Sequence, residues 1–183
     1  MTKVITGPKT RWSYVNVWTP KSIQGSTPKY SVSLIIPKSD TKTVNKIKAA
    51  IKEAYEEGLS KLKGSAKVAP ALSVIKTPLR DGDLERAGDP AYAGAYFINA
   101  NATQAPGIVD KNREDIIDHS EVYSGVYGRA SITFYAFNSN GNKGIACGLN
   151  NLQKIADGEP LGGHVKAAVD FADCDDDDED FLD

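Results

Sequence analysis

Residues 129–138 have the sequence RASITFYAFN, and alternation along this stretch predicts a β-strand with two different faces. One face carries only apolar side chains: Ala130, Ile132, Phe134 and Ala136. The other face carries one basic, two hydroxyl and two aromatic side chains: Arg129, Ser131, Thr133, Tyr135 and Phe137. We expect the apolar face to pack into a core, which leaves the second face for solvent or for a ligand.

Similar patterns elsewhere in the chain predict an antiparallel sheet built from about five or six strands. The candidate strands are residues 11–19, 30–36, 95–102, 121–138 and 143–155. Gly125 and Gly128 are expected to mark a bend or bulge inside the fourth of these. Connections rich in Gly, Pro and Asp separate the strands.

A single clear helix is predicted over residues 40–63, with Ser39 or Asp40 as its N-cap and Gly64 at its end. Apolar side chains recur at spacings of three and four, at Val44, Ile47, Ile51, Tyr55, Leu59 and Leu62. The opposite face is rich in lysine, which suits either plain solvation or contact with a nucleic acid. Strands arranged around one buried helix predict a mainly β protein with one or two helices. We expect an OB-fold, a five-stranded Greek-key barrel, with long loop insertions, and a β-sandwich is the alternative.

The charge of the chain is divided between a basic body and an acidic end. The formal net charge is −2, but residues 170–183 hold nine acidic side chains and no basic one. Residues 1–169 therefore keep all 22 Lys and Arg against 15 acids, a net charge of +7. We expect a folded domain over 1–169 that attracts polyanions, followed by a disordered acidic tail over 170–183.

Aromatic side chains next to lysine and arginine residues suggest a surface on which nucleic-acid bases could stack. In residues 11–19, strict alternation places Trp12, Tyr14 and Trp18 on one face and two valines on the other. Either face could be the interior, and the sequence leaves this open. The predicted nucleic-acid contacts are Arg11, Trp12, Tyr14, Trp18, Lys21, Tyr96, Tyr127, Arg129, Tyr135 and Phe137.

Catalytic and metal-binding patterns are poorly represented, so we expect a binding protein without enzymatic activity, metal or cofactor. His119 and His164 have no partner at metal-ligand spacing, and the DGD tripeptide at 81–83 is typical of a turn. Cys147 and Cys174 are expected to be free thiols. No apolar run is long enough to span a membrane, and no secretion signal is recognisable, which favours the cytoplasm.

The tail ends in a hydrophobic tip after an acidic run, a pattern that favours a docking peptide over a simple solubility tail. Its predicted partner-binding residues are Asp175, Asp176, Asp177, Asp178, Glu179, Asp180 and Phe181. We expect acidic residues to steer the tail toward a basic pocket, in which the phenylalanine ring is the anchor. The run lacks the glycine and the final glutamate of a calcium-binding loop.

Several short motifs together resemble the Enc34-like family of phage single-stranded DNA-binding proteins. They are RWSY (11–14), PLRDG (78–82), YAGAYFIN (92–99), VYSGVYGR (122–129), KGIACGLN (143–150) and DGEPLGG (157–163). The resemblance covers roughly residues 10–165 and implies an OB-fold that binds single-stranded DNA largely without sequence preference.

That resemblance also implies a role in phage or prophage DNA replication, recombination or repair, in the cytoplasm of a bacterial host. The acidic tail is similar to the tails of replicative single-strand binders, which recruit partner proteins and compete with DNA. A homodimer is compatible with this role. The alternative function is a protein-interaction scaffold of a replication complex with little DNA affinity of its own.

Overall fold

The computed structural model describes residues 2–22 and 25–161. Its strands are β1 (Thr2–Ile5), β2 (Arg11–Lys21), β3 (Lys29–Pro37), β4 (Arg80–Asp81), β5 (Ala95–Ala102), β6 (Gly107–Val109), β7 (Tyr127–Ser139) and β8 (Asn142–Ala156). Its helices are α1 (Thr41–Glu57), α2 (Leu59–Lys63) and α3 (Gly82–Glu85), with short 3-10 turns η1 (Leu72–Val74) and η2 (His119–Glu121).

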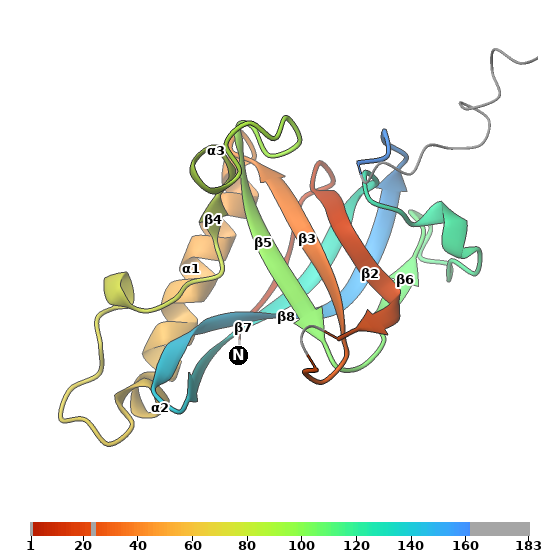
Figure 1. Ribbon diagram of the computed structural model, residues 1–183. Coiled ribbons are helices and arrows are strands. Elements are labelled where there is room, and N and C mark those ends of the chain that lie inside the picture. Colours follow the sequence, from red (N-terminus) through yellow and green to blue (C-terminus); the bar gives the residue numbers. More distant parts are fainter. Residues whose placement is uncertain (1, 23–24, 162–183) are drawn as a thin grey trace, which may run out of the picture.

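Five of these strands close into a barrel, as expected for an OB-fold (Figure 1). The hydrogen-bonded order is β7-β2-β3-β5-β8, and a long antiparallel ladder between β8 and β7 closes the ring. All contacts around the ring are antiparallel except β5 with β8, which are parallel and pair only at Asn101 and Gly148. The short strands β1 and β6 extend the sheet at its two edges.

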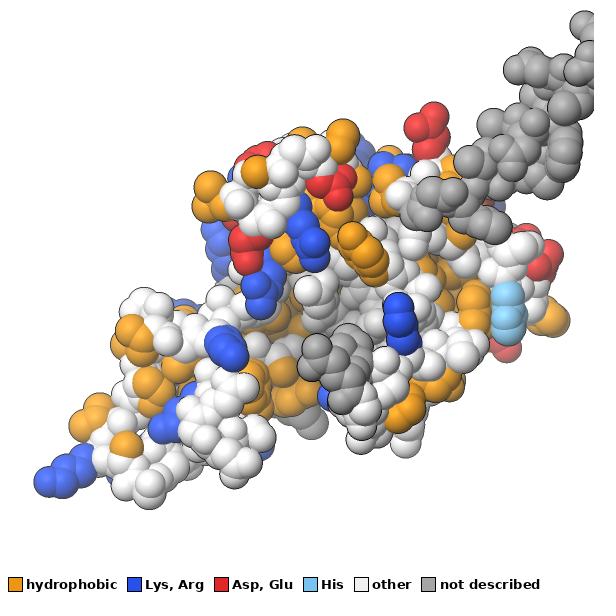
Figure 2. Space-filling view, viewed as in Figure 1, with side chains coloured by type: hydrophobic (Ala, Val, Ile, Leu, Met, Phe, Trp, Pro, Cys, Tyr) orange, Lys and Arg blue, Asp and Glu red, His pale blue; other side chains and the backbone are white. Residues whose placement is uncertain are grey.

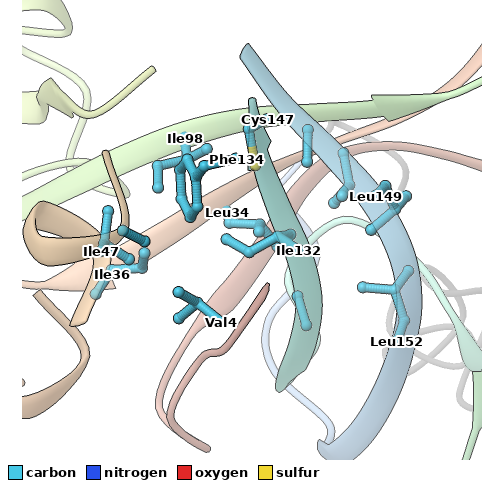
Figure 3. Close-up of a cluster of buried hydrophobic side chains, with 14 of the residues drawn as sticks. Val4, Leu34, Ile36, Ile47, Ile98, Ile132, Phe134, Cys147, Leu149 and Leu152 are labelled. Atoms are coloured by element: carbon cyan, nitrogen blue, oxygen red, sulfur yellow. The ribbon is translucent and has the colours of Figure 1, made fainter. Parts of the chain in front are cut away.

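The barrel interior holds the core, and the alternation of residues 129–138 is confirmed. Ala130, Ile132, Phe134 and Ala136 are all buried, and they meet side chains from β3, β5, β8 and α1. Figure 3 shows Phe134 and Ile132 of β7 beside Leu34 of β3, with Cys147 and Leu149 on the neighbouring β8. Burial raises the pKa of the Cys147 thiol, which is free, so it remains protonated and inert at neutral pH.

The predicted helix over 40–63 is observed as two helices, α1 and α2, that are separated at Gly58. Asp40 is the N-cap, since its carboxylate accepts the backbone N–H of Thr43 at 3.3 Å. Gly58 lies against β7 so closely that a Cβ there would be 2.2 Å from the Cβ of Ala136. The glycine therefore permits the helix to approach the barrel, and it ends α1 earlier than the apolar spacing suggests.

In β2 the expected strict alternation is wrong, because a bulge interrupts the strand. Ser13 pairs with Ser33 and Asn16 pairs with Ser31, so β2 has one more residue than β3 in this interval. The extra residue is accommodated at Tyr14, whose φ of 47° lies in the left-handed region. As a consequence, Trp12 and Val17 both face the core while Tyr14 is exposed.

Candidate nucleic-acid interface

A continuous row of small, polar and basic residues crosses the outer face of the barrel. The strand registers pair Asn16 with Ser31, Ser31 with Asn101, Asn101 with Gly148, Gly148 with Thr133 and Thr133 with Lys3. We call these six residues the polar row. Their sequence neighbours are mostly core residues, since side chains alternate between the two faces of a strand. The row therefore crosses six strands and offers side-chain hydrogen-bonding groups on five of them, with a glycine on β8 and no bulky aliphatic side chain in the way.

Part of this row forms the floor of an open groove, with a volume of about 560 Å³, where β5 and β8 meet. The groove is lined by Lys29, Asn101, Ala102, Thr103, Gln104, Ala105, Gly107, Tyr135, Gly148, Leu149, Asn150 and Asn151. Within the part of the chain that the structure describes, the lining combines amides, one lysine and one ring, without a carboxylate. In Figure 2 the face that carries β3 and β5 is hollowed, with a largely white floor and lysine or arginine side chains on both sides.

Of the residues that the structure describes, Tyr135 is the only aromatic one that lines the groove, and a glycine makes room for its ring. An ideal Cβ on Gly148 would lie 3.5 Å from the Tyr135 ring, so the ring rests over a position without a side chain. Asn150 donates a hydrogen bond of 2.8 Å to the Thr133 hydroxyl, which orders the amide beside the ring. The arrangement offers one ring face for stacking and neighbouring amides for hydrogen bonding.

A second aromatic region lies on the same outer face, around the bulge in β2. Tyr14 is 58% exposed, and the Arg86 guanidinium carbon lies 5.8 Å from the centroid of its ring. Arg86 also lies 5.5 Å from the Tyr92 ring and 5.4 Å from the Phe97 ring, both of which are buried. The bulge thus turns one ring out to solvent next to an arginine that is held over two buried rings.

Ionic contacts fix the loop that carries Arg86. The Lys38 ammonium lies 2.8 Å from a carboxylate oxygen of Asp83 and 2.9 Å from one of Asp81. The hydrogen bonds with Asp83 and Asp81 raise the pKa of Lys38, and the bond from Lys38 lowers the pKa of Asp83. Asp83 also accepts the backbone N–H of Gly94 at 2.9 Å. Both ends of the loop are therefore tied to the end of β3.

Two of the predicted contact residues are tryptophans, and the structure places both in packing roles. Trp12 is fully buried, and its indole N–H donates to the carbonyl of Gly128 at 3.2 Å. The prediction that Trp12 contacts a ligand is therefore wrong, because the bulge keeps this ring in the core. Trp18 packs partly against the core and stacks on His119, with ring centroids 4.0 Å apart and planes at 5°.

Three other predicted residues also make contacts within the fold. Arg11 donates to the carbonyls of Gly125 and Glu159, at 3.1 and 2.7 Å, and lies over the Tyr127 ring. Arg11 and Tyr127 thus hold the segment that follows β8. Tyr96 lies on the core side of β5, where the ammonium groups of Lys38 and of Lys48 from α1 lie over its ring. This side is opposite to the polar row.

The remaining predicted residues lie at separate positions. Tyr14 and Tyr135 are on the outer face as described above, and Lys21 is exposed at the end of β2, opposite Lys29. Phe137 is half-buried, with its ring next to Gly144. Arg129 lines a different hollow, which lies over the β7–β8 ladder between β1 and β6.

Sequence reasoning missed the groove amides and Arg86. Asn99 and Asn101 alternate with apolar residues in β5, so their outward orientation could have been predicted from the sequence. The meeting of Asn101 with Gly148 depends on the parallel pairing of β5 and β8, which no local pattern shows. Arg86 lies in a loop, where periodicity gives no information.

Several expectations concern residues outside the described ranges, namely Cys174, His164 and the whole acidic tail with its seven predicted partner-binding residues. Within residues 2–22 and 25–161, no group of three or more His, Cys, Asp or Glu side chains could hold a metal ion. None of the helices in that part of the chain has the length and apolar character needed to cross a bilayer.

Comparison with known proteins gives a consistent result. Residues 2–182 match the family model described as the single-stranded DNA-binding protein of Enterobacter phage Enc34. Protein p50 of Acyrthosiphon pisum secondary endosymbiont phage 1 is 31% identical over 170 residues, which is 89% of each chain.

Solved structures agree with the family model. The Enc34 protein in complex with single-stranded DNA matches with a TM-score of 0.68 and 29% identity, over 87% of this chain and 88% of that one. The gp2.5 protein of bacteriophage T7 matches with a TM-score of 0.62 and 13% identity, over 91% of this chain and 98% of that one, and supports the fold alone. The family match over nearly the whole length, together with these similarities, shows that the chain belongs to the Enc34 family of phage single-stranded DNA-binding proteins.

Proposed function

We propose that this protein binds single-stranded DNA, with little preference for sequence, along the outer face of its barrel. The observation that carries the proposal is the polar row, which crosses the outer face of the barrel and forms part of the floor of the groove beside Tyr135, where β5 and β8 meet. OB-folds bind oligonucleotides across their second and third strands, which here are β3 and β5. The related Enc34 structure is a complex with single-stranded DNA, which supports the same ligand for this chain.

The chemistry of the face suits single strands better than duplexes. Tyr135 and Tyr14 offer ring faces, and every unpaired base has a π-face that can stack on them, at about 1–3 kcal/mol per base. Lys29, Lys21 and Arg86 supply positive charge near these rings for the phosphate backbone. Stacking and phosphate contacts do not distinguish one base from another, so weak sequence preference is expected.

Fluorescence anisotropy with a labelled dT oligomer tests this proposal, with Tyr135→Ala as the variant and Tyr135→Phe as the matched control. The alanine variant should bind about 5- to 150-fold more weakly, which corresponds to one lost stacked base. The phenylalanine variant should bind like the wild type, because it keeps the ring. Equal binding by all three proteins would show that the groove does not hold DNA.

The same proposal includes a role in phage DNA replication, recombination or repair within the bacterial cytoplasm, with the acidic tail recruiting partner proteins. The described body is basic, with 21 Lys and Arg against 15 Asp and Glu over residues 2–161. A tail with nine acids would compete with DNA for such a surface. Deleting residues 170–183 should raise DNA affinity at low salt, and unchanged affinity would remove competition from the proposal.

A further inference from the structure

A second hollow, with its own set of lining residues, lies over the β7–β8 ladder, between β1 and β6. It has a volume of about 310 Å³ and is lined by Lys3, Ile5, Val109, Arg113, Arg129, Ala130, Ser131, Asn151, Leu152 and Gln153. We call it the basic hollow, because among the described residues three cationic side chains line it and no carboxylate does. Among the described residues, Lys3, Arg113 and Arg129 form no ion pair.

The fold brings these three basic side chains together from different parts of the chain. Lys3 and Ile5 of β1 pair with Thr133 and Ser131 of β7, so they share the outer face with Arg129. Arg129 donates a long hydrogen bond of 3.5 Å to the carbonyl of Thr6, and this contact orients its guanidinium.

Arg113 is presented by a tightly bonded turn after β6. The Asp110 carboxylate accepts the backbone N–H groups of Asn112 and Glu114, at 2.8 and 3.1 Å. The Gln153 amide ties the same turn to β8 through hydrogen bonds of 3.4 Å to the carbonyls of Asp110 and Lys111. These hydrogen bonds hold the turn without any contribution from the Arg113 side chain.

The basic hollow adjoins the proposed DNA path at two points. Asn151 lines both the hollow and the groove, and Lys3, at the end of the polar row, lines the hollow. Guanidinium groups match phosphate oxygens with paired hydrogen bonds, and a lysine adds a point charge. Ile5, which is 43% exposed, offers an apolar contact for a sugar or a base.

We propose that the basic hollow binds phosphate groups of the same DNA strand after the strand leaves the groove, so that the strand continues along the outer face of the β7–β8 ladder, between β1 and β6. This inference rests on the proposed function. It assigns Arg113, Arg129 and Lys3 as backbone contacts that only longer oligomers can reach.

The test compares the wild type with an Arg113→Gln/Arg129→Gln variant on dT oligomers of about 4 to 20 nucleotides, a range that spans the site sizes of OB-folds. The two proteins should bind the shortest oligomers equally and differ beyond a threshold length. For long oligomers, losing two phosphate contacts should make the slope of log K against log salt shallower by about 1.4. If the two proteins bind equally at 1 M salt, the variant should then bind about 25-fold more weakly than the wild type at 0.1 M salt.

A matched control removes two exposed lysines of α1 with Lys42→Gln/Lys52→Gln, which changes the net charge by the same amount away from both hollows. This control should follow the wild type at every length. Two results would overturn the inference. Either the arginine variant and the wild type have the same dT affinity at all oligomer lengths, or their affinities differ by the same factor at all lengths. If inorganic phosphate binds to the basic hollow while dT binding shows no length-dependent difference between variant and wild type, the hollow would be a site for a free anion instead.

Failure of the inference and failure of the proposed function give different data. If the wild type binds no dT oligomer, both fail. If the wild type binds short and long oligomers and the arginine variant matches it throughout, DNA binding is retained and only the extended path is lost. A thermal melt of each variant confirms that folding is unchanged.

Discussion

Tyr14 combines an unfavourable backbone with an exposed ring, which makes it a sharp test of the interface. Its φ of 47° lies in the left-handed region, where an L-residue with a side chain is destabilised by about 1–2 kcal/mol. Residues held in such conformations cluster at functional sites. Replacing Tyr14 with glycine relieves this strain, and it also removes the ring that we expect to stack on a base.

The expected effects on stability and on binding differ in size. Relief of about 1–2 kcal/mol is offset by the conformational entropy of glycine, about 0.5–1 kcal/mol, and by loss of packing on a ring that is more than half exposed. The free energy of unfolding should therefore change by less than about 1 kcal/mol. DNA binding should lose about 1–3 kcal/mol of stacking, so the Kd should rise about 5- to 150-fold.

Urea unfolding and fluorescence anisotropy with dT measure the two effects on the same samples. Tyr14→Ala is the matched control, because alanine removes the ring but keeps the backbone strain. Alanine and glycine variants should share one Kd, while the alanine variant unfolds more easily by about 1 kcal/mol. Wild-type affinity in the glycine variant, or a loss of stability above about 3 kcal/mol, would refute the reasoning.

Three further perturbations have defined outcomes. Gly148→Leu should fill the groove under Tyr135 and weaken dT binding about 5- to 150-fold with unchanged folding. Gly148→Ala should bind dT like the wild type, and equal binding by the two variants would contradict a role of this groove in DNA binding. Trp12→Ala should lower the free energy of unfolding by about 3–5 kcal/mol in urea, and a loss below about 1 kcal/mol would show that the ring is not a core residue. The hydrogen bond from Lys38 lowers the pKa of Asp83, so this carboxylate should stay ionised and bound until the pH falls through the lowered value. The NMR shift of the Gly94 amide, which donates to Asp83, should therefore titrate with a midpoint below about pH 3.9, the ordinary aspartate pKa. A midpoint above that pH would count against the contact between Lys38 and Asp83.

Much of the fold could be predicted because its signals are local. The alternation along β7 and the apolar spacing of α1 each identify a buried face without knowledge of the partner. The short strands β1, β4 and β6 could not be predicted, since two to four residues carry no readable period and depend on pairing with longer strands. The bulge in β2 was missed for a similar reason, because it becomes apparent only when β2 is paired with β3.

The candidate site was predictable only in part. Tyr135 could be placed on the outer face from the alternation of β7 alone, and the structure confirms that position. The polar row could not be predicted, because its members are distant in sequence and meet only through strand registers. For Trp12 the sequence predicted a DNA contact that the fold excludes. Its ring follows an arginine in the sequence, but it is buried in the core.

The most direct test of the central claim is photo-crosslinking of a dT oligomer that carries 5-iodouracil, with the modified residues identified by mass spectrometry. If single-stranded DNA follows the outer face, crosslinks should fall on the peptides that contain Tyr14 and Tyr135. Crosslinks confined to the lysine-rich outer surface of α1 (Thr41–Glu57), with none on either tyrosine peptide, would contradict the account.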